Sequence, residues 1–232
     1  MRQIAITCDI DWAPDYMVRF VTDMLTAAKV KATFFITHES PVLAEMRSNP
    51  LFEIGAHPNF MPGSTHGKTE DEVLAHVRRL VPEAKAIRTH GLIQSSNLLD
   101  KFLAYGFERD VSLLLPHATG LARNVIYNSE KPLLRIPYNW EDDEEMLRPD
   151  ARWTPEKILA TNGLAVFDFH PVHVFLNSRS MDGYTKLKSV GLSKATEEFA
   201  RSCVMQGDGP LTMLKALLEV LQTERSHWVS EL

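Results

Sequence analysis

Short apolar stretches alternate with longer amphipathic stretches along the first half of the chain. The apolar stretches have the length of β-strands, and the amphipathic ones repeat their apolar positions every three to four residues, as surface helices do. This alternation is typical of units in which parallel strands are joined by helices. The predicted strands are residues 4–8, 32–37, 52–56 and 84–89, and the predicted helices are residues 15–29, 41–47, 69–80 and 95–105.

The second half of the chain follows the same pattern with less regularity. Residues 107–115 and 132–137 read as strands, with mostly turn residues between them. A helix is predicted to start at Thr154, because Thr can cap a helix and Pro155 suits its first turn. A strand at residues 164–169 and helices at residues 193–204 and 211–222 complete the predicted elements.

No repeat, low-complexity tract or change of composition divides the 232 residues. The pattern therefore predicts an α/β fold built as one domain over residues 1–232, with a mainly parallel sheet. A (β/α) barrel and a doubly wound sheet both fit the alternation. Because the two differ in where ligands bind, the polar residues at strand ends bear on the choice.

Charge and hydropathy bear on whether the protein binds nucleic acid or a membrane. The formal net charge is −5, and Lys and Arg are scattered rather than clustered, which argues against a nucleic-acid partner. No run approaches the roughly 18 apolar residues of a membrane span. A strand-like pattern begins at residue 4 and leaves no room for a secretory signal, so we expect a cytoplasmic protein. The composition leaves an oligomer open.

Polar residues recur at the carboxyl ends of the predicted strands. In (β/α) barrels and related sheets the site is built at this edge from the ends of several strands, so the recurrence predicts a functional site there. The residues concerned are Asp9 and Asp11 after the first strand, His57 after the third, Arg88 and His90 after the fourth, Tyr138 and Trp140 after residues 132–137, and His170 and His173 after residues 164–169.

Asp9 and Asp11 are two residues apart, which in an extended chain places both carboxylates on one face. One carboxylate can then bind a metal ion while the other stays free as a base. A helix N-cap is the competing interpretation of these acids. His57 follows a buried strand and is suited as an imidazole ligand for a divalent metal, with a hydrogen-bonded structural histidine as its alternative.

Other histidines are candidates for the same site. His66 lies in a loop rich in Pro and Gly that can curl back, so it either completes a metal site or lies on the surface. Strand alternation places Asp168 on the same face as His170, which suggests a proton donor beside a carboxylate partner. The direction of His173 is less defined, because Pro171 turns the chain before it.

Residues 4–11, of sequence IAITCDID, resemble the first motif of the polysaccharide deacetylases, the NodB-like family 4 carbohydrate esterases, which reads T-F-D-D or close to it. Residues 31–36, KATFFI, resemble the second-strand signature of the same family. The resemblance implies a distorted (β/α) barrel of about seven parallel strands. It also implies hydrolysis of N-acetyl or O-acetyl groups with a divalent metal held by one Asp and two His, commonly zinc, with Co, Mn and Ni as alternatives.

The resemblance implies roles for individual residues. By position, Asp9 would be the general base, Asp11 and His57 metal ligands, Arg88 the arginine that orients the base, and His170 the general acid. The side chains expected to contact the sugar are Trp12, His90, Tyr138 and Trp140.

Two positions depart from the family pattern. The second ligand of its H-x-x-x-H motif would fall at Met61, so we assign His66 as the third metal ligand in its place. The usual R-x-P becomes Arg88-Thr89-His90, and this imidazole near the metal can alter the pocket or replace His66.

Together these expectations describe a metal-dependent hydrolase that removes an acyl group, acetyl above all, from an amino sugar or sugar precursor in polysaccharide biosynthesis. A small carbohydrate is then the expected partner. Two alternatives stay open: an allantoinase-like cyclic amidohydrolase on the same fold, and a catalytically silent sugar-binding protein.

Overall fold

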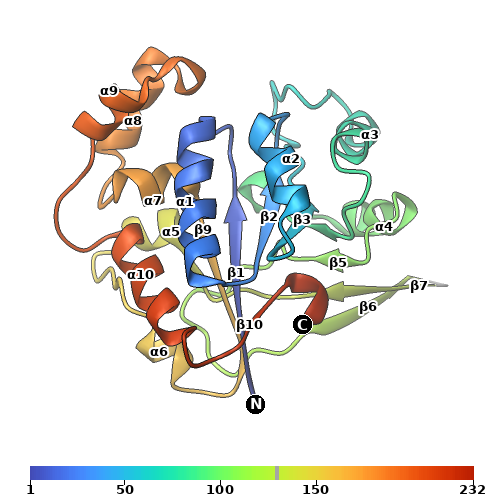
Figure 1. Cartoon of the computed structure of the whole chain (residues 1–232). Coiled ribbons are helices and arrows are strands. Elements are labelled where there is room, and N and C mark those ends of the chain that lie inside the picture. Colours follow the sequence, from blue (N-terminus) through green and yellow to red (C-terminus); the bar gives the residue numbers. More distant parts are fainter. Residues whose placement is uncertain (129–130) are drawn as a thin grey trace.

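A twisted sheet forms the centre of the computed structural model, which describes residues 1–128 and 131–232 (Figure 1). The strands lie in the order β6-β7-β5-β4-β3-β2-β1-β9-β8, and β10 pairs with β1. Neighbouring strands are parallel except β6 and β7, which form an antiparallel hairpin. The bounds are β1 (Arg2–Asp9), β2 (Ala32–Ile36), β3 (Phe52–Ala56), β4 (Ala86–Ile87), β5 (Arg109–Asp110), β6 (Asn124–Asn128), β7 (Lys131–Arg135), β8 (Trp140–Glu141), β9 (Gly163–Phe169) and β10 (Ser226–His227).

The sheet curls into a half-barrel of parallel strands. On its open side the chain between β7 and β8 crosses from one edge towards the other. The amide of Tyr138 donates to the carbonyl of Leu113 at 3.0 Å, and the amide of Asn139 donates to the carbonyl of Val166 at 2.9 Å. The prediction of an α/β fold with a distorted (β/α) barrel is confirmed.

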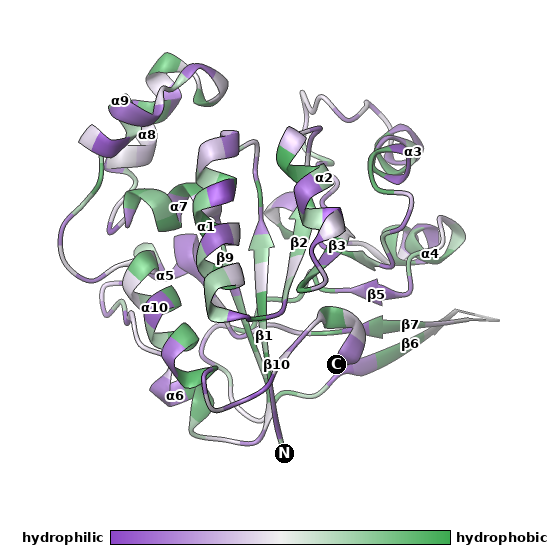
Figure 2. Cartoon of the chain, viewed as in Figure 1, coloured by the Kyte–Doolittle hydropathy of each residue, from purple (hydrophilic) through white to green (hydrophobic). Residues whose placement is uncertain are grey.

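Helices cover the outside of the curled sheet, and local sequence signals explain several of their starts. Ser40 caps α2 with Pro41 in its first turn, and Thr69 caps α3 in a capping box with Glu72. In Figure 2, α7 is largely hydrophobic, whereas α1 carries both hydrophobic and hydrophilic segments. The bounds are α1 (Asp15–Ala28), α2 (Pro41–Ser48), α3 (Glu70–Leu80), α4 (Ser96–Ala104), α5 (Asp142–Met146), α6 (Glu156–Leu159), α7 (Pro171–Leu176), α8 (Asp182–Val190), α9 (Glu197–Ser202) and α10 (Pro210–Val220).

A cluster of apolar side chains fills the inside of the barrel. Phe35 and Val166 pack there, and the last residues of the chain close the space beneath them with Val229 and Leu232. The carboxyl ends of the strands carry the buried polar residues instead. The candidate site is therefore built at the carboxyl ends of the strands.

Several elements differ from their predictions. The predicted strands at residues 84–89 and 107–115 shrink to the two-residue ladders β4 and β5, and the predicted helix at residues 193–204 begins only with α9. The elements β6, β8, β10, α5, α7 and α8 were not predicted. Within the described ranges, no helix has the length and apolar character needed to cross a membrane.

Candidate active site

A turn after β1 carries Asp11 and Trp12 over the carboxyl end of the barrel. Both residues have left-handed backbone conformations, with φ of 38° and 55°, which residues other than glycine rarely adopt. The amide of Trp12 donates to Oγ1 of Thr37 at 3.2 Å and so ties this turn to the end of β2. Strained backbone of this kind is found where a site fixes a side chain, and here it fixes the carboxylate of Asp11.

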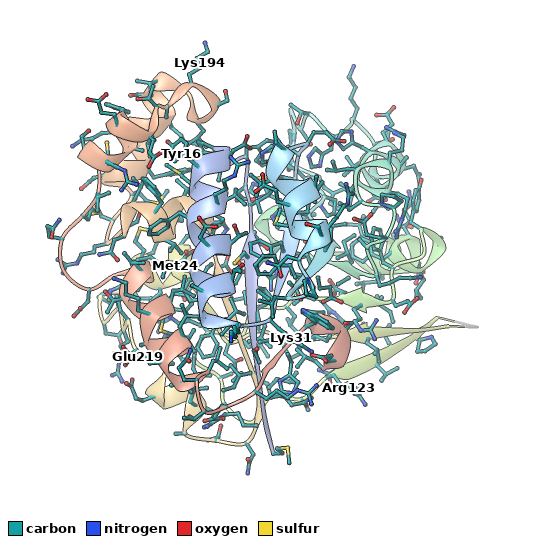
Figure 3. The ribbon with its side chains drawn as sticks, viewed as in Figure 1. Tyr16, Met24, Lys31, Arg123, Lys194 and Glu219 are labelled. Atoms are coloured by element: carbon teal, nitrogen blue, oxygen red, sulfur yellow. The ribbon has the colours of Figure 1, made fainter. Side chains whose placement is uncertain are left out.

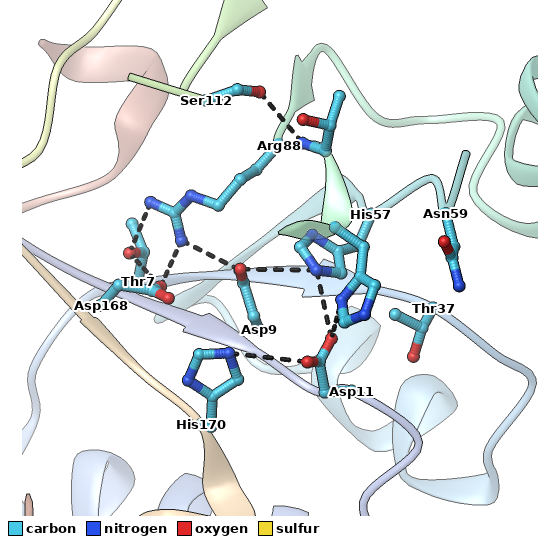
Figure 4. Close-up of polar contacts among 12 residues, drawn as sticks. Thr7, Asp9, Asp11, Thr37, His57, Asn59, Arg88, Ser112, Asp168 and His170 are labelled. Atoms are coloured by element: carbon cyan, nitrogen blue, oxygen red, sulfur yellow. Dashed lines mark hydrogen bonds and ion pairs between the residues drawn. The ribbon is translucent and has the colours of Figure 1, made fainter. Parts of the chain in front are cut away.

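The Asp11 carboxylate lies between two histidines from neighbouring strand ends. Its Oδ1 lies 3.1 Å from Nε2 of His57, which follows β3 (Figure 4). The same oxygen lies 3.1 Å from Nδ1 of His90, which follows β4. Burial would raise the pKa of Asp11, but hydrogen bonds from His57 and His90 outweigh it and hold that pKa well below its usual value. Asp11 is therefore an ionised carboxylate at neutral pH.

These three side chains fit a divalent cation. Carboxylate oxygen and imidazole nitrogen are common zinc ligands, and at bond lengths of about 2.1 Å two ligand atoms of a tetrahedral site lie roughly 3.4 Å apart. The ligand atoms of Asp11, His57 and His90 lie within 4.8 Å of one another. Three protein ligands are typical of catalytic zinc, which keeps one position open.

His66, which we predicted as the third ligand, does not join this group; the structure brings His90 beside Asp11 and His57 instead. Nδ1 of His66 accepts from the amide of Asn59 at 3.1 Å, and Nε2 therefore carries the proton that it donates to the carbonyl of Thr37 at 2.7 Å. Burial lowers the pKa of His66 to about 4, which keeps the ring neutral. The loop does curl back as expected, but His66 holds its backbone in place and does not face the cation site.

Arg88 connects the inside of the barrel to Asp9. Its guanidinium is fully buried and donates to Oδ1 of Asp9 at 2.9 Å, to Oγ1 of Thr7 at 2.9 Å and to Asp168. Figure 4 shows the Arg88 guanidinium between Asp9 on one side and Thr7 and Asp168 on the other. Burial raises the pKa of Asp168 to about 7 although the charge of Arg88 opposes it. The hydrogen bond from Arg88 thus fixes the orientation of the Asp9 carboxylate.

His170 follows β9 and faces Asp11 from the opposite side. Its Nε2 lies 3.6 Å from Oδ2 of Asp11, while Nδ1 lies 2.7 Å from Oδ1 of Asp142. The backbone amide of His170 also donates to Asp142 at 2.8 Å, so Asp142 holds both the backbone and the ring of His170. Burial would lower the pKa of His170, but the charge of Asp142 outweighs it and the pKa lies well above its usual value. The ring is therefore held in its protonated form.

His173 is not part of the candidate cation group, although its ring centroid lies 5.7 Å from that of His170. It lies in α7, where its Nδ1 contacts Oγ of Ser178 at 3.1 Å and its ring packs on Tyr184. Burial lowers its pKa. The late histidine of the site is therefore His170 rather than His173.

Two of the four residues predicted to contact the sugar are core residues. Tyr138 is fully buried, with its ring 4.4 Å from the Arg88 guanidinium carbon and its hydroxyl 2.6 Å from Glu141. Trp140 is 1% exposed and packs on Phe169 and other aromatic rings. Neither ring can stack on a sugar from these positions, so both predictions are corrected. Trp12 is partly exposed and remains a candidate for sugar contact.

Thr7 is a member of the site that the sequence interpretation missed. Its hydroxyl lies 2.6 Å from Oδ1 of Asp168 and accepts from Arg88. A signal was present, because Thr7 precedes Asp9 by two residues on the same strand and so shares its face. Asp142, the first residue of α5, is a further member of the site and supports the ring of His170.

Comparisons with known proteins show which family the chain resembles. The chain matches the family described as WbmS-like polysaccharide deacetylases over residues 6–188. A crystal structure from Bordetella bronchiseptica, described as a candidate polysaccharide deacetylase (WbmS) involved in O-antigen biosynthesis, is 32% identical, covers 94% of this chain and 90% of its own, and superposes with a TM-score of 0.83. A comparison with curated proteins gives no match.

More distant structures share the fold alone. A candidate polysaccharide deacetylase from Mycobacterium smegmatis is 15% identical over 97% of this chain and 92% of its own, with a TM-score of 0.56. A CE4 family pseudoenzyme from Bacillus anthracis is 13% identical over 100% of this chain and 65% of its own, with a TM-score of 0.52.

The fold and the sequence match define the class as the polysaccharide deacetylases of the NodB-like carbohydrate esterase group. Within it, the chain belongs to the WbmS-like polysaccharide deacetylase family.

Proposed function

We propose that this protein is a metal-dependent deacylase that removes an acyl group, above all acetyl, from an amino sugar of a surface polysaccharide or its precursor. The observation that carries the proposal is the meeting of one acid, one base and a three-ligand cation group at one end of the barrel. The B. bronchiseptica relative is described as involved in O-antigen biosynthesis, and we carry the same kind of substrate over to this chain.

Asp11, His57 and His90 would hold the cation. A divalent cation bound there supplies a Lewis acid that lowers the pKa of water and polarises the acyl carbonyl. Zinc suits the donor set, with Co, Mn and Ni as alternatives. The prediction of zinc is tested by elemental analysis of protein purified without added metal.

Asp9 would act as the general base. Its carboxylate lies 3.5 Å from Nε2 of the proposed ligand His57, through Oδ2, while its Oδ1 accepts from Arg88. Oδ2 is thus the oxygen that faces the reacting centre and can take the proton of the attacking water. Arg88 orients this carboxylate through the hydrogen bond to Oδ1 and leaves Oδ2 free for the water.

His170 would act as the general acid. Its Nε2 faces the same centre from the opposite side, and Asp142 holds both its orientation and its proton. A protonated imidazole in this place can give its proton to the nitrogen of the departing amino sugar as the C–N bond breaks. The acid and base therefore flank the position of the acyl carbon.

The test is acetate release from acetylated amino-sugar oligosaccharides by purified protein, before and after removal of metal with a chelator. We expect release only while metal is present. If no acyl sugar is hydrolysed by protein with stoichiometric metal, deacylation is refuted, and hydrolysis of ureides in the same preparation would select the allantoinase-like alternative. Cell fractionation tests the further expectation of a cytoplasmic location.

A further inference from the structure

A cleft of about 510 Å³ lies beside the candidate cation site. Trp12 connects the cleft to the candidate cation site. It lines the cleft, and its ring centroid lies 5.4 Å from that of His90. The walls are residues 12–16 after β1, residues 38–41 after β2, and residues 193–197 between α8 and α9. In Figure 1, α8 and α9 stand beside the end of α1 where these segments meet. A sugar unit next to the reacting one would enter this space.

The wall between α8 and α9 is tied to the catalytic half of the cleft by Tyr16. Its hydroxyl donates to the carbonyl of Ala195 at 3.2 Å, and its ring packs on Phe175. Figure 3 shows Tyr16 at the end of α1 and Lys194 pointing outward, away from it. These contacts of Tyr16 hold the two walls of the cleft together. Lys194 faces solvent rather than the cleft.

The lining of the cleft is anionic. Its charged members among the described residues are the acids Asp15, Glu39 and Glu197, with no Lys or Arg. Glu197 is paired with Arg201 at 2.5 Å, whereas Asp15 accepts from the hydroxyl of Ser40 and no ion pair of Glu39 is found in the described part of the chain. The carboxylates of Asp15 and Glu39 are thus free to interact with a ligand bound in the cleft.

The chemistry of the lining selects a particular kind of sugar unit. A tryptophan ring stacks on sugar rings and attracts cations over its face, and two uncompensated carboxylates attract an ammonium and repel a phosphate. An amino sugar that has already lost its acyl group carries both a ring and an ammonium. A sugar attached directly to a diphosphate would place negative charge against Asp15 and Glu39.

We propose that this cleft is a subsite for the sugar unit adjacent to the one that reacts, and that Trp12, Asp15 and Glu39 select a unit carrying a free ammonium group. The position of the subsite rests on the proposed function, since the reacting unit lies at Asp11, His57 and His90. Partly deacylated chains would then be preferred over fully acylated chains.

The test compares the binding of two disaccharides that carry no acyl group, so that the result does not depend on turnover. The glucosamine disaccharide carries ammonium groups, and cellobiose carries hydroxyls in their place. By calorimetric titration of the metal-loaded protein we expect the glucosamine disaccharide to bind about fivefold more tightly, the combined effect of an exposed ion pair and a cation–π contact.

Glu39→Gln and Asp15→Asn should each reduce this ratio of dissociation constants to about twofold or less. Glu219→Gln, which removes an exposed carboxylate on α10, is the matched control and should leave the ratio at its wild-type value (Figure 3). Equal binding of the two disaccharides by the wild-type protein, or a ratio that neither cleft variant changes, overturns the proposal. A preserved preference in a protein that releases no acetate would refute the deacylase proposal and leave the ammonium selectivity standing.

Discussion

Replacing His90 and His66 separately distinguishes a metal ligand from a structural histidine. His90→Ala removes one of the three proposed protein ligands. Loss of a residue that merely supports a metal ligand typically costs 10- to 100-fold in metal affinity, so loss of a ligand itself should cost about 100-fold or more. The stability of the metal-free protein should change little, because the side chain of His90 is 26% exposed.

His66→Ala should lower the stability of the protein and leave its metal affinity unchanged, the opposite of His90→Ala. It leaves the amide of Asn59 and the carbonyl of Thr37 without their partner, and each unsatisfied buried group costs about 1–3 kcal/mol. In a chain of this size a loss of 1 kcal/mol lowers Tm by roughly 2–4 °C. His66→Gln, which keeps one donor and one acceptor, should recover part of the loss.

The assay is zinc titration of chelator-stripped protein against a competing chelator, with thermal unfolding of the same samples. We predict weak zinc binding with near-normal Tm for His90→Ala, and near-normal zinc binding with low Tm for His66→Ala. Weak zinc binding by folded His66→Ala together with normal binding by His90→Ala would refute the ligand assignment and restore His66 as the third ligand.

Three further predictions concern the groups around the site. Arg88→Met should lower the free energy of unfolding by about 3–5 kcal/mol in urea titrations, because it leaves buried carboxylates uncompensated; a cost under 1 kcal/mol would contradict the buried network. Asp142→Asn should reduce kcat roughly 10- to 100-fold with metal content unchanged, because the proton and orientation of His170 depend on that carboxylate; an unchanged kcat would remove His170 as the acid. Trp140→Ala should destabilise the fold by about 3–5 kcal/mol while KM for the sugar stays within twofold, and a large rise in KM would return Trp140 to the sugar-binding surface.

The central strands were predictable because burial on both faces leaves a continuous apolar run. β2 is buried at every position, and such a run carries its own signal. The ladders β4 and β5 are two residues long and are defined by the strands that flank them, so their bounds are absent from local sequence. α7 was missed because Pro171 was taken as a chain turn, although proline also suits the first turn of a helix.

The site was predictable to the extent that strand ends fix it. Asp9, His57, Arg88 and His170 meet because the carboxyl ends of neighbouring parallel strands meet at one edge. His66 and His90 were both possible third ligands. The difference is that both ring nitrogens of His66 are hydrogen-bonded to backbone groups, of Asn59 and Thr37. Such contacts form only in three dimensions, and no spacing in the sequence encodes them.

The aromatic residues show the same limit. Tyr138 and Trp140 alternate along the chain at the strand end, which suits a sugar platform and a buried core equally well. The chain from the end of β7 to the start of β8 turns both side chains into the protein. Tyr138 covers Arg88, and Trp140, the first residue of β8, packs among aromatic rings. Only the course of that segment decides between the two roles.

The central claim is that Asp9 is the base of a metal-dependent deacylation, and its most direct test is acetate release by zinc-loaded wild-type protein and Asp9→Asn measured beside their zinc content. Asn retains an oxygen that can accept from Arg88, so the fold and the cation group should persist. We predict equal zinc stoichiometry and a fall in kcat of roughly 10²- to 10⁴-fold, the usual contribution of a positioned base. Acetate release by Asp9→Asn at the wild-type rate, or none from wild-type protein with full zinc occupancy, would contradict it.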